Sequence, residues 1–297
     1  MVTSAGRPGT AHPVLLVLLA VVSVQFGGAL AATLLPLVGV VGSVALRLTL
    51  STAMLWALVR PRVRGRSRAD WAVVGLFSAA LTCMNLAFYA SLARLPIGVA
   101  VTIEFLGPLA LAAALSRQAR DALAVLAALT GVVLISEALT VPWAQLDLTG
   151  MLLAALAGAC WAAYIVLSAR TGARFEGLDG IAICLALGAA VTLPLGLVTA
   201  GADLWQPRAI LTGLGIALLS SAIPYSLELL ALRHLAAGTF GVLLSLEPAA
   251  ALAGLLVLSQ LLGPLQLLGM ALVVVASIAV LGRRTGSTLS AAPDPSG

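Results

Sequence analysis

Long apolar stretches separated by short polar connections run along the whole chain. Each is close to the length of about 20 residues that a helix needs to cross the ~30 Å hydrocarbon core of a bilayer. The stretches are apolar on every side and do not alternate between two faces as membrane-barrel strands do, so they predict helices. Ten spans are expected, at residues 14–35, 38–59, 71–91, 97–116, 122–139, 149–169, 180–200, 209–230, 237–259 and 264–282.

The composition indicates the same class of protein. Of the 297 residues, 61% are hydrophobic and only 9% are charged, whereas soluble domains carry about 25% charged residues. The mean hydropathy is +1.13. Too little polar surface is available to cover a water-soluble globule, so the chain is predicted to be an all-α integral membrane protein with the lipid bilayer as its partner.

The distribution of positive charge predicts the orientation of the spans. All sixteen basic residues are arginine, and the formal net charge is +5. With the N-terminus in the cytoplasm, thirteen arginines fall in cytoplasmic segments and only Arg94 and Arg208 in outer loops. The arginines lie between apolar runs and form no stripe beside aromatic residues, so no nucleic-acid partner is expected. Residues 1–13 and 283–297 are predicted to be cytoplasmic tails, the second one disordered.

An internal repeat is visible at an offset of 140 residues. Five spans fall in each half, at 14–139 and 149–282, and because five is odd the second half must be inverted relative to the first. Inverted repeats of this kind are typical of carriers, which bind substrate near the midplane and rock one half against the other. The matched pairs are Gly75 and Gly215, Leu92 and Leu232, Leu95 and Leu235, Gly98 and Gly238, and Pro108 and Pro248.

Four ionisable residues are expected inside the membrane: Arg47, Glu104, Glu228 and Glu247. Insertion scales put the cost of such a group at roughly 2.5–3.5 kcal/mol at a helix centre, so each is a functional hypothesis. Glu247 corresponds in the repeat to position 107, three residues after Glu104 and on the same helix face. The alternative, that these groups only pair within the bundle, stays open.

Two prolines and several polar side chains complete the predicted pathway. Pro108 and Pro248 lack an N–H group, which frees the carbonyls of Glu104 and Leu244 to hold a cation or a substrate donor. Plain helix kinks and ordinary interhelical hydrogen bonds are the alternatives at these positions. The polar candidates are Gln25, Asn85, Tyr89, Trp161, Tyr164 and Tyr225.

Several motifs are absent from the sequence. It has no P-loop and no Ser/His/Asp or H-E-x-x-H set, which argues against an ATP-driven pump and against an enzyme. His12 and His234 have no Cys or carboxylate at ligand spacing, so no metal site is expected. The three cysteines lie in apolar stretches and suggest packing and not disulfides. No cofactor is predicted.

Seven segments in combination resemble the EamA family of the drug/metabolite transporter superfamily, and within it the threonine/homoserine exporter branch. The resemblance covers residues 12–282 and departs from the family pattern at Thr33 and at Ser259-Gln260. The segments are Ser23–Ala29, Leu35–Gly39 leading to Leu46-Arg47, Met84–Tyr89, Glu104–Ala110, Gly158–Ala162, Pro224–Leu232 and Ser245–Ala249.

The resemblance implies a ten-helix carrier of the bacterial inner membrane that expels small amino acids with the proton gradient as its driving force. A zwitterionic substrate needs a cation for its carboxylate and an anion for its ammonium group, and we expect Arg47 in the first role and Glu104 or Glu247 in the second. The alternatives are an uncoupled exporter of other metabolites or toxic analogues, and a membrane enzyme or structural subunit. A homodimer is also left open.

Overall fold

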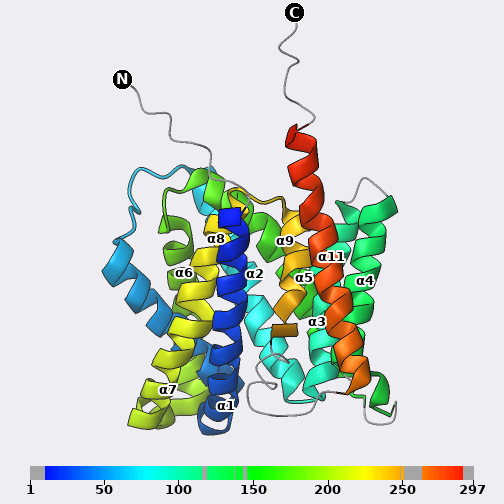
Figure 1. Cartoon of the computed structure of the whole chain (residues 1–297). Coiled ribbons are helices and arrows are strands. Elements are labelled where there is room, and N and C mark those ends of the chain that lie inside the picture. The colour runs from blue at the N-terminus through cyan, green and yellow to red at the C-terminus, as the bar shows by residue number, and fades with distance from the viewer. Residues whose placement is uncertain are drawn as a thin grey trace, which may run out of the picture.

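The protein is a bundle of helices (Figure 1), seen here in a computed structural model that describes residues 11–115, 119–136, 138–142, 146–247, 249–250 and 263–289. The predicted all-α membrane fold is confirmed. The helices are α1 (Ala11–Val59), α2 (Arg68–Leu92), α3 (Ile97–Ala114), α4 (Ala119–Ile135), α5 (Leu148–Arg174), α6 (Asp179–Ala200), α7 (Pro207–Ala217), α8 (Ile223–Leu232), α9 (Ala237–Leu244) and α11 (Pro264–Leu289). The short turns η1 (Ala138–Thr140), η3 (Gly201–Trp205) and η4 (Leu218–Ala222) lie between them.

The helix α1 contains the first two predicted spans. Its 49 residues are interrupted at Gly39, whose backbone has φ 67° and ψ −174°. Only glycine adopts this combination easily, because it has no Cβ. Gly39 therefore divides α1 into a first leg, residues 11–38, and a second leg, residues 40–59, close to the predicted boundary between 35 and 38.

The other helices correspond to the remaining spans. Within the described residues, five helical segments are long and apolar enough to cross a membrane, and four shorter apolar helices accompany them. The ninth span is described only as far as residue 250, so its predicted end at 259 lies outside the described residues. The helix α11 continues to Leu289, beyond the predicted end at 282, because a helix satisfies its own backbone outside the apolar stretch as well as inside it.

One predicted span, residues 209–230, is locally distorted near its centre. It consists of α7 and α8 joined by η4, a turn of π-helix. Pro224, two residues after this turn, has no N–H group to donate to the carbonyl of Ser220, so the regular hydrogen-bond ladder cannot continue there. Turns of this type are common at functional sites.

The two ends of the bundle differ in their charged groups. The first leg of α1 begins and α11 ends at the same end, which an even number of spans requires (Figure 1). The connections around Arg60 to Arg66, Arg174 and Arg233 also lie at this end, which we call the arginine end. At the opposite end Asp147 caps α5, and the hydrogen bond from the N–H of Gly150 to its carboxylate lowers the pKa of Asp147 below its ordinary value.

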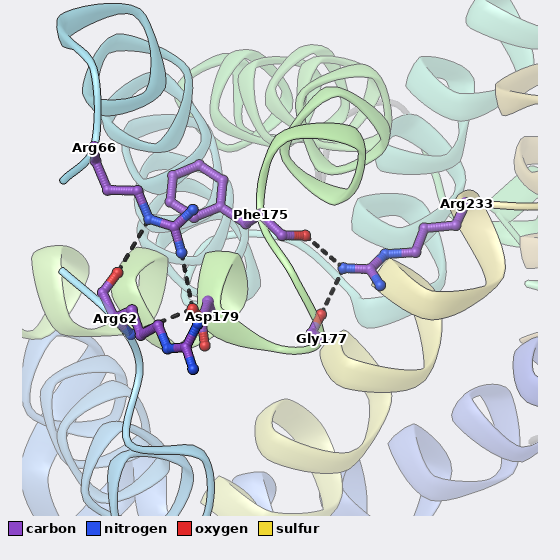
Figure 2. A network of polar contacts seen from close by, with 6 residues as sticks. All are labelled: Arg62, Arg66, Phe175, Gly177, Asp179 and Arg233. Atoms are coloured by element: carbon purple, nitrogen blue, oxygen red, sulfur yellow. Dashed lines mark hydrogen bonds and ion pairs between the residues drawn. The ribbon is translucent and has the colours of Figure 1, made fainter. Parts of the chain in front are cut away.

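A polar network joins three connections at the arginine end (Figure 2). The Nη2 atom of Arg66 lies 2.9 Å from Oδ2 of Asp179, which also accepts a hydrogen bond from the backbone N–H of Arg62. The guanidinium of Arg66 stacks 4.6 Å from the ring centre of Phe175. Arg233 in turn donates from Nη2 to the carbonyls of Phe175 and Gly177, at 2.8 and 2.6 Å. The network ties the α1–α2, α5–α6 and α8–α9 connections together.

Glycines allow the central helices to approach closely. A Cβ atom built on Gly158 of α5 would stand 2.6 Å from the carbonyl oxygen of Glu104 in α3, and one on Gly107 would overlap the carbonyl of Gly158. Small residues at such crossings let helix backbones meet in lipid. The close crossing brings Glu104 on α3 and Trp161 on α5 into the middle of the bundle.

The crossing predicts opposite effects for two glycine-to-alanine substitutions. Gly158→Ala should destabilise the protein by about 1–3 kcal/mol, because the methyl group meets backbone that cannot move aside. Gly75→Ala, also within a helix but with no atom within 4 Å of the new methyl group, should leave the stability unchanged or raise it slightly. The measurement is the apparent Tm in detergent, and equal Tm values for the two variants would contradict the close crossing.

Candidate functional site

A cavity of about 680 Å³ lies between the central helices. Both legs of α1, together with α2, α3, α5, η4 and α8, contribute to its wall. Nine of the residues proposed from the sequence line it: Gln25, Arg47, Asn85, Tyr89, Glu104, Trp161, Tyr225, Glu228 and Glu247. Residues as far apart in the chain as Gln25 and Glu247 are thus brought together at one place.

Arg47 is the cation of this cavity. It lies in the second leg of α1 and is only 5% exposed. Its Nη1 donates to the hydroxyl of Tyr89 at 3.1 Å and its Nη2 to that of Tyr225 at 3.0 Å. Its Nε is buried and has no hydrogen-bond partner among the described residues. Because a guanidinium carries five N–H donors, Arg47 keeps donors available for a ligand.

Asn85 and Tyr225 form a contact across the two halves of the chain. The side-chain amide of Asn85 donates to the carbonyl of Leu81 at 2.7 Å and to the hydroxyl of Tyr225 at 3.2 Å. The two residues are separated by 140 positions, which is the offset of the sequence repeat. Equivalent residues of an inverted repeat meet only next to its two-fold axis, so this hydrogen bond marks the centre of the bundle.

The helix ends agree with the same offset. The helices α2 and α8 end at Leu92 and Leu232, and α3 and α9 begin at Ile97 and Ala237. The members of each pair run in opposite directions through the bundle (Figure 1). The matched Leu95 and Leu235 are each 5% exposed. The local structure therefore supports the repeat predicted from the sequence.

Three carboxyl groups face the cavity together with the single guanidinium. Glu104 of α3 is 7% exposed, and neither it nor Glu247 has a hydrogen bond or ion pair within the described part of the chain. Electrostatic interactions link Glu104 to Arg47 and to Glu247, and Glu247 to Glu228. Glu247 therefore interacts with both other acids, and Arg47 acts on Glu104 less strongly than Glu247 does.

Glu228 is held by an aromatic cluster. Its Oε2 accepts a hydrogen bond of 2.8 Å from the hydroxyl of Tyr164. The ring of Tyr164 is fully buried and packs between Phe77 and Tyr225, with ring centres 5.3 and 5.6 Å away. Tyr164, proposed as a pathway residue, therefore stands behind the cavity wall and orients Glu228.

Two further wall residues differ in how firmly they are held. Trp161 packs edge-on against Phe105 with ring centres 4.8 Å apart, which gives the cavity a rigid apolar side. Gln25 in the first leg of α1 is half-buried, and the described residues offer its amide no hydrogen-bond partner. Its amide is free to serve a ligand.

The prolines have a different relation to the site. The helix α3 continues through Pro108, and the carbonyl oxygen of Glu104, which loses its usual donor there, lies against the backbone of Gly158. Pro248 lies outside the described residues. Thr33, where the sequence departs from the family pattern, is exposed and bonds the carbonyl of Leu30, away from the cavity wall.

Eight residues that line the cavity were not proposed as site residues from the sequence, among them Met84, Phe88 and Ser220. Ser220 lies in the π turn, and Pro224 within a predicted span was the available signal for it. Met84 and Phe88 are apolar residues in an apolar helix, so no pattern distinguishes them from residues that face lipid.

The cavity extends toward the end of the bundle opposite the arginine end. Leu35 lies just before the Gly39 turn and Leu92 is the last residue of α2, and both line the cavity. At the arginine end, none of the residues in the network of Figure 2 lines the cavity. No group of three His, Cys, Asp or Glu side chains suited to a metal ion is found in the described part of the chain.

Comparisons with known proteins point to one family. Residues 148–282 match the EamA-like transporter family. Threonine/homoserine exporter RhtA of Escherichia coli (strain K12) is 40% identical over 279 residues, which cover 94% of this chain and 92% of the relative. The exporter of the same name from Salmonella typhimurium (strain SL1344) is 39% identical over 284 residues, covering 95% and 93%. A solved crystal structure, 19% identical, covers 93% of this chain and 99% of that chain with a TM-score of 0.74, and shares the fold.

The geometry around Arg47 predicts unequal effects for its two tyrosines. Tyr225→Phe should lower the Tm more than Tyr89→Phe, because the first removes the acceptor of one Arg47 N–H and of one Asn85 N–H, and the second removes the acceptor of one Arg47 N–H only. Each buried donor left unpaired costs about 1–3 kcal/mol. The check is a thermal unfolding series of the purified variants, and a larger loss for Tyr89→Phe would contradict the bonding pattern.

Proposed function

Because the chain belongs to the EamA-like transporter family, we propose that it exports L-threonine, L-homoserine or a similar small amino acid across the bacterial inner membrane in exchange for protons. Membership of this family makes the protein a membrane transporter and not an enzyme.

The observation that carries the proposal is Arg47 and Glu104 in one cavity, each with unused bonding capacity. Arg47 keeps N–H donors, including the buried Nε, and the carboxylate of Glu104 has no partner in the described residues. A zwitterion presents the complementary groups, a carboxylate for the guanidinium and an ammonium for the glutamate. Such pairing compensates for the water that both partners lose on entering the cavity.

The remaining wall favours a short polar side chain. The amide of Gln25 and the hydroxyl hydrogen of Tyr89 can bond a substrate hydroxyl, as those of threonine and homoserine require. Trp161 covers the apolar part of the substrate. The cavity volume of about 680 Å³ lies within the range of roughly 300–1,000 Å³ of ligand sites, so a small amino acid enters together with water.

The glutamates give the site the means to couple transport to protons. Shielding from water favours the neutral form of a carboxyl group, so such a group takes up a proton in a closed cavity and releases it to open water. One proton moving across 100 mV supplies about 2.3 kcal/mol, which sustains roughly a 50-fold substrate gradient. Three carboxyl groups face the cavity.

The shape of the cavity fits one state of an alternating-access cycle. The cavity approaches the end with few arginines, which the charge distribution puts outside the cell, while the network of Figure 2 joins the connections at the arginine end. We therefore take this arrangement as the state open to the outside. Release of the network would let the other end open.

Export assays test the substrate and the site together. Cells producing the native chain should release labelled threonine or homoserine faster than cells without it. Arg47→Gln and Glu104→Gln should slow release by about 30-fold or more, since an unpaired buried charge costs roughly 2 kcal/mol or more. Glu176→Gln, which changes an exposed acid of the α5–α6 connection, should export normally.

Two results would oppose the proposal. If Arg47→Gln and Glu104→Gln both reach the membrane and export normally, these residues do not form the substrate site. Export that ignores a pH gradient in vesicles would leave an uncoupled exporter, the main alternative from the sequence.

The network at the arginine end predicts a shift between access states. Asp179→Asn keeps an acceptor for the backbone N–H of Arg62 but removes the ion pair with Arg66, so the arginine end should open more often. In a variant without the native cysteines, Ser220→Cys should then react faster with an impermeant maleimide added from the cytoplasmic side. An unchanged reaction rate, or the same increase with Glu176→Gln, would contradict this role.

A further inference from the structure

The three carboxyl groups of the cavity outnumber its cation. Among the described residues that line the cavity, Arg47 is the one arginine, and Glu104, Glu228 and Glu247 are the acids. A zwitterionic substrate adds no net charge and cannot correct this imbalance. Buried charges without partners are strongly unfavourable, so the cavity requires further positive charge, and protons are available in every state of the cycle.

We propose that Glu228, held by Tyr164, is the proton-binding group of this transporter, and that it is separate from the Arg47 and Glu104 pair that binds the amino acid. The proposal rests on the proposed function and assigns a distinct role to one of the three acids. Tyr164 is a positioning residue in this scheme, because it touches Glu228 and does not line the cavity.

The surroundings of Glu228 are those of a group that gains and loses a proton. The residue is 4% exposed, yet it contributes to the cavity wall. The ion pairs in the described part of the chain lie at helix ends and do not include it. A single neutral hydrogen bond, from Tyr164 at 2.8 Å, supports its ionised form. A proton removes the uncompensated charge when the cavity closes, and water stabilises the carboxylate when it opens.

The titratable neighbours on each packed element leave this role to Glu228. From α1 comes Arg47, which donates to Tyr89 and Tyr225. The helix α5 supplies Tyr164, and α6 supplies the buried Cys184 near Tyr164. On α8 itself Tyr225 bonds Arg47, and Arg233 is engaged by the carbonyls of the α5–α6 connection. Glu247, beyond α9, interacts electrostatically with Glu228.

Glu247 connects the two sites. It interacts electrostatically with Glu104 on one side and with Glu228 on the other. An ammonium group bound beside Glu104 and a proton bound at Glu228 therefore each relieve repulsion that acts on Glu247. Once one of them is bound, binding of the other gains less free energy. Binding energies coupled in this way are reciprocal. An exchanger requires that binding of the proton weakens binding of the substrate, and that binding of the substrate weakens binding of the proton.

The test separates exchange of substrate from coupling to protons. The full chain is reconstituted in liposomes, and two rates are measured with labelled threonine: counterflow at equal pH, and transport driven by a pH gradient. Glu228→Gln should keep counterflow, because the amide mimics the protonated acid, and should lose acceleration by the gradient and pH dependence. Glu104→Gln should lose both rates, and Glu176→Gln neither.

A second variant tests the role of Glu228 if Glu228→Gln does not fold. Tyr164→Phe removes the one hydrogen bond to the carboxyl group, and it should displace the midpoint of the pH profile while counterflow at the optimum pH persists. Absence of counterflow by the native chain would overturn the proposed function itself. If the native chain shows counterflow, three results would each overturn the assignment of the proton to Glu228. They are gradient-driven transport by Glu228→Gln, an unchanged pH profile in Tyr164→Phe, and loss of counterflow in a folded Glu228→Gln.

Discussion

The burial of one guanidinium in the middle of a bilayer constrains the rest of this structure. Arg47 cannot reach water along its helix, so the protein must supply its acceptors. It does so with the hydroxyls of Tyr89 and Tyr225, and not with a carboxylate. Neutral acceptors stabilise the cation without cancelling its charge, and the field of Arg47 remains available to a ligand in the cavity. A direct ion pair with Glu104 would have satisfied both groups and left nothing to bind.

The helix packing serves this arrangement. Tyr89 and Tyr225 come from α2 and α8, one from each half of the chain, so the two halves must meet at Arg47. The glycine contacts between α3 and α5 bring Glu104 and Trp161 to the wall of one cavity. The π turn before Pro224 changes the direction of the polar side chains on that span, and Ser220, within the turn, faces the cavity. This irregular turn of the helix therefore lies where the wall of the cavity is polar.

The sequence was sufficient to predict those features that depend on the free energy of moving side chains from water into lipid. Apolar stretches of sufficient length predicted the spans, and the cost of charge in lipid singled out Arg47 and the three glutamates. The pairing of these residues could not be predicted, because a hydrogen bond such as that from Tyr164 to Glu228 depends on which helix faces lie together, and apolar helices carry little information on their orientation. Wall residues such as Met84 and Phe88 were missed for the same reason.

The hydrogen bond between Asn85 and Tyr225 has a consequence for how the two halves move. In an inverted repeat, each half adopts in one access state the conformation that the other half has in the opposite state. A contact between equivalent residues of the two halves is therefore the same in both states. The Asn85–Tyr225 bond can stay intact throughout the cycle while the halves move about it. The contact of Arg66 with Asp179 has no such partner: an offset of 140 carries these positions to Gln206 and Gly39. At the opposite end the described residues form a different and more exposed pair, Arg94 with Asp147 at 3.3 Å. The two access states are therefore held by unlike charged contacts, and the resting preference follows from that asymmetry.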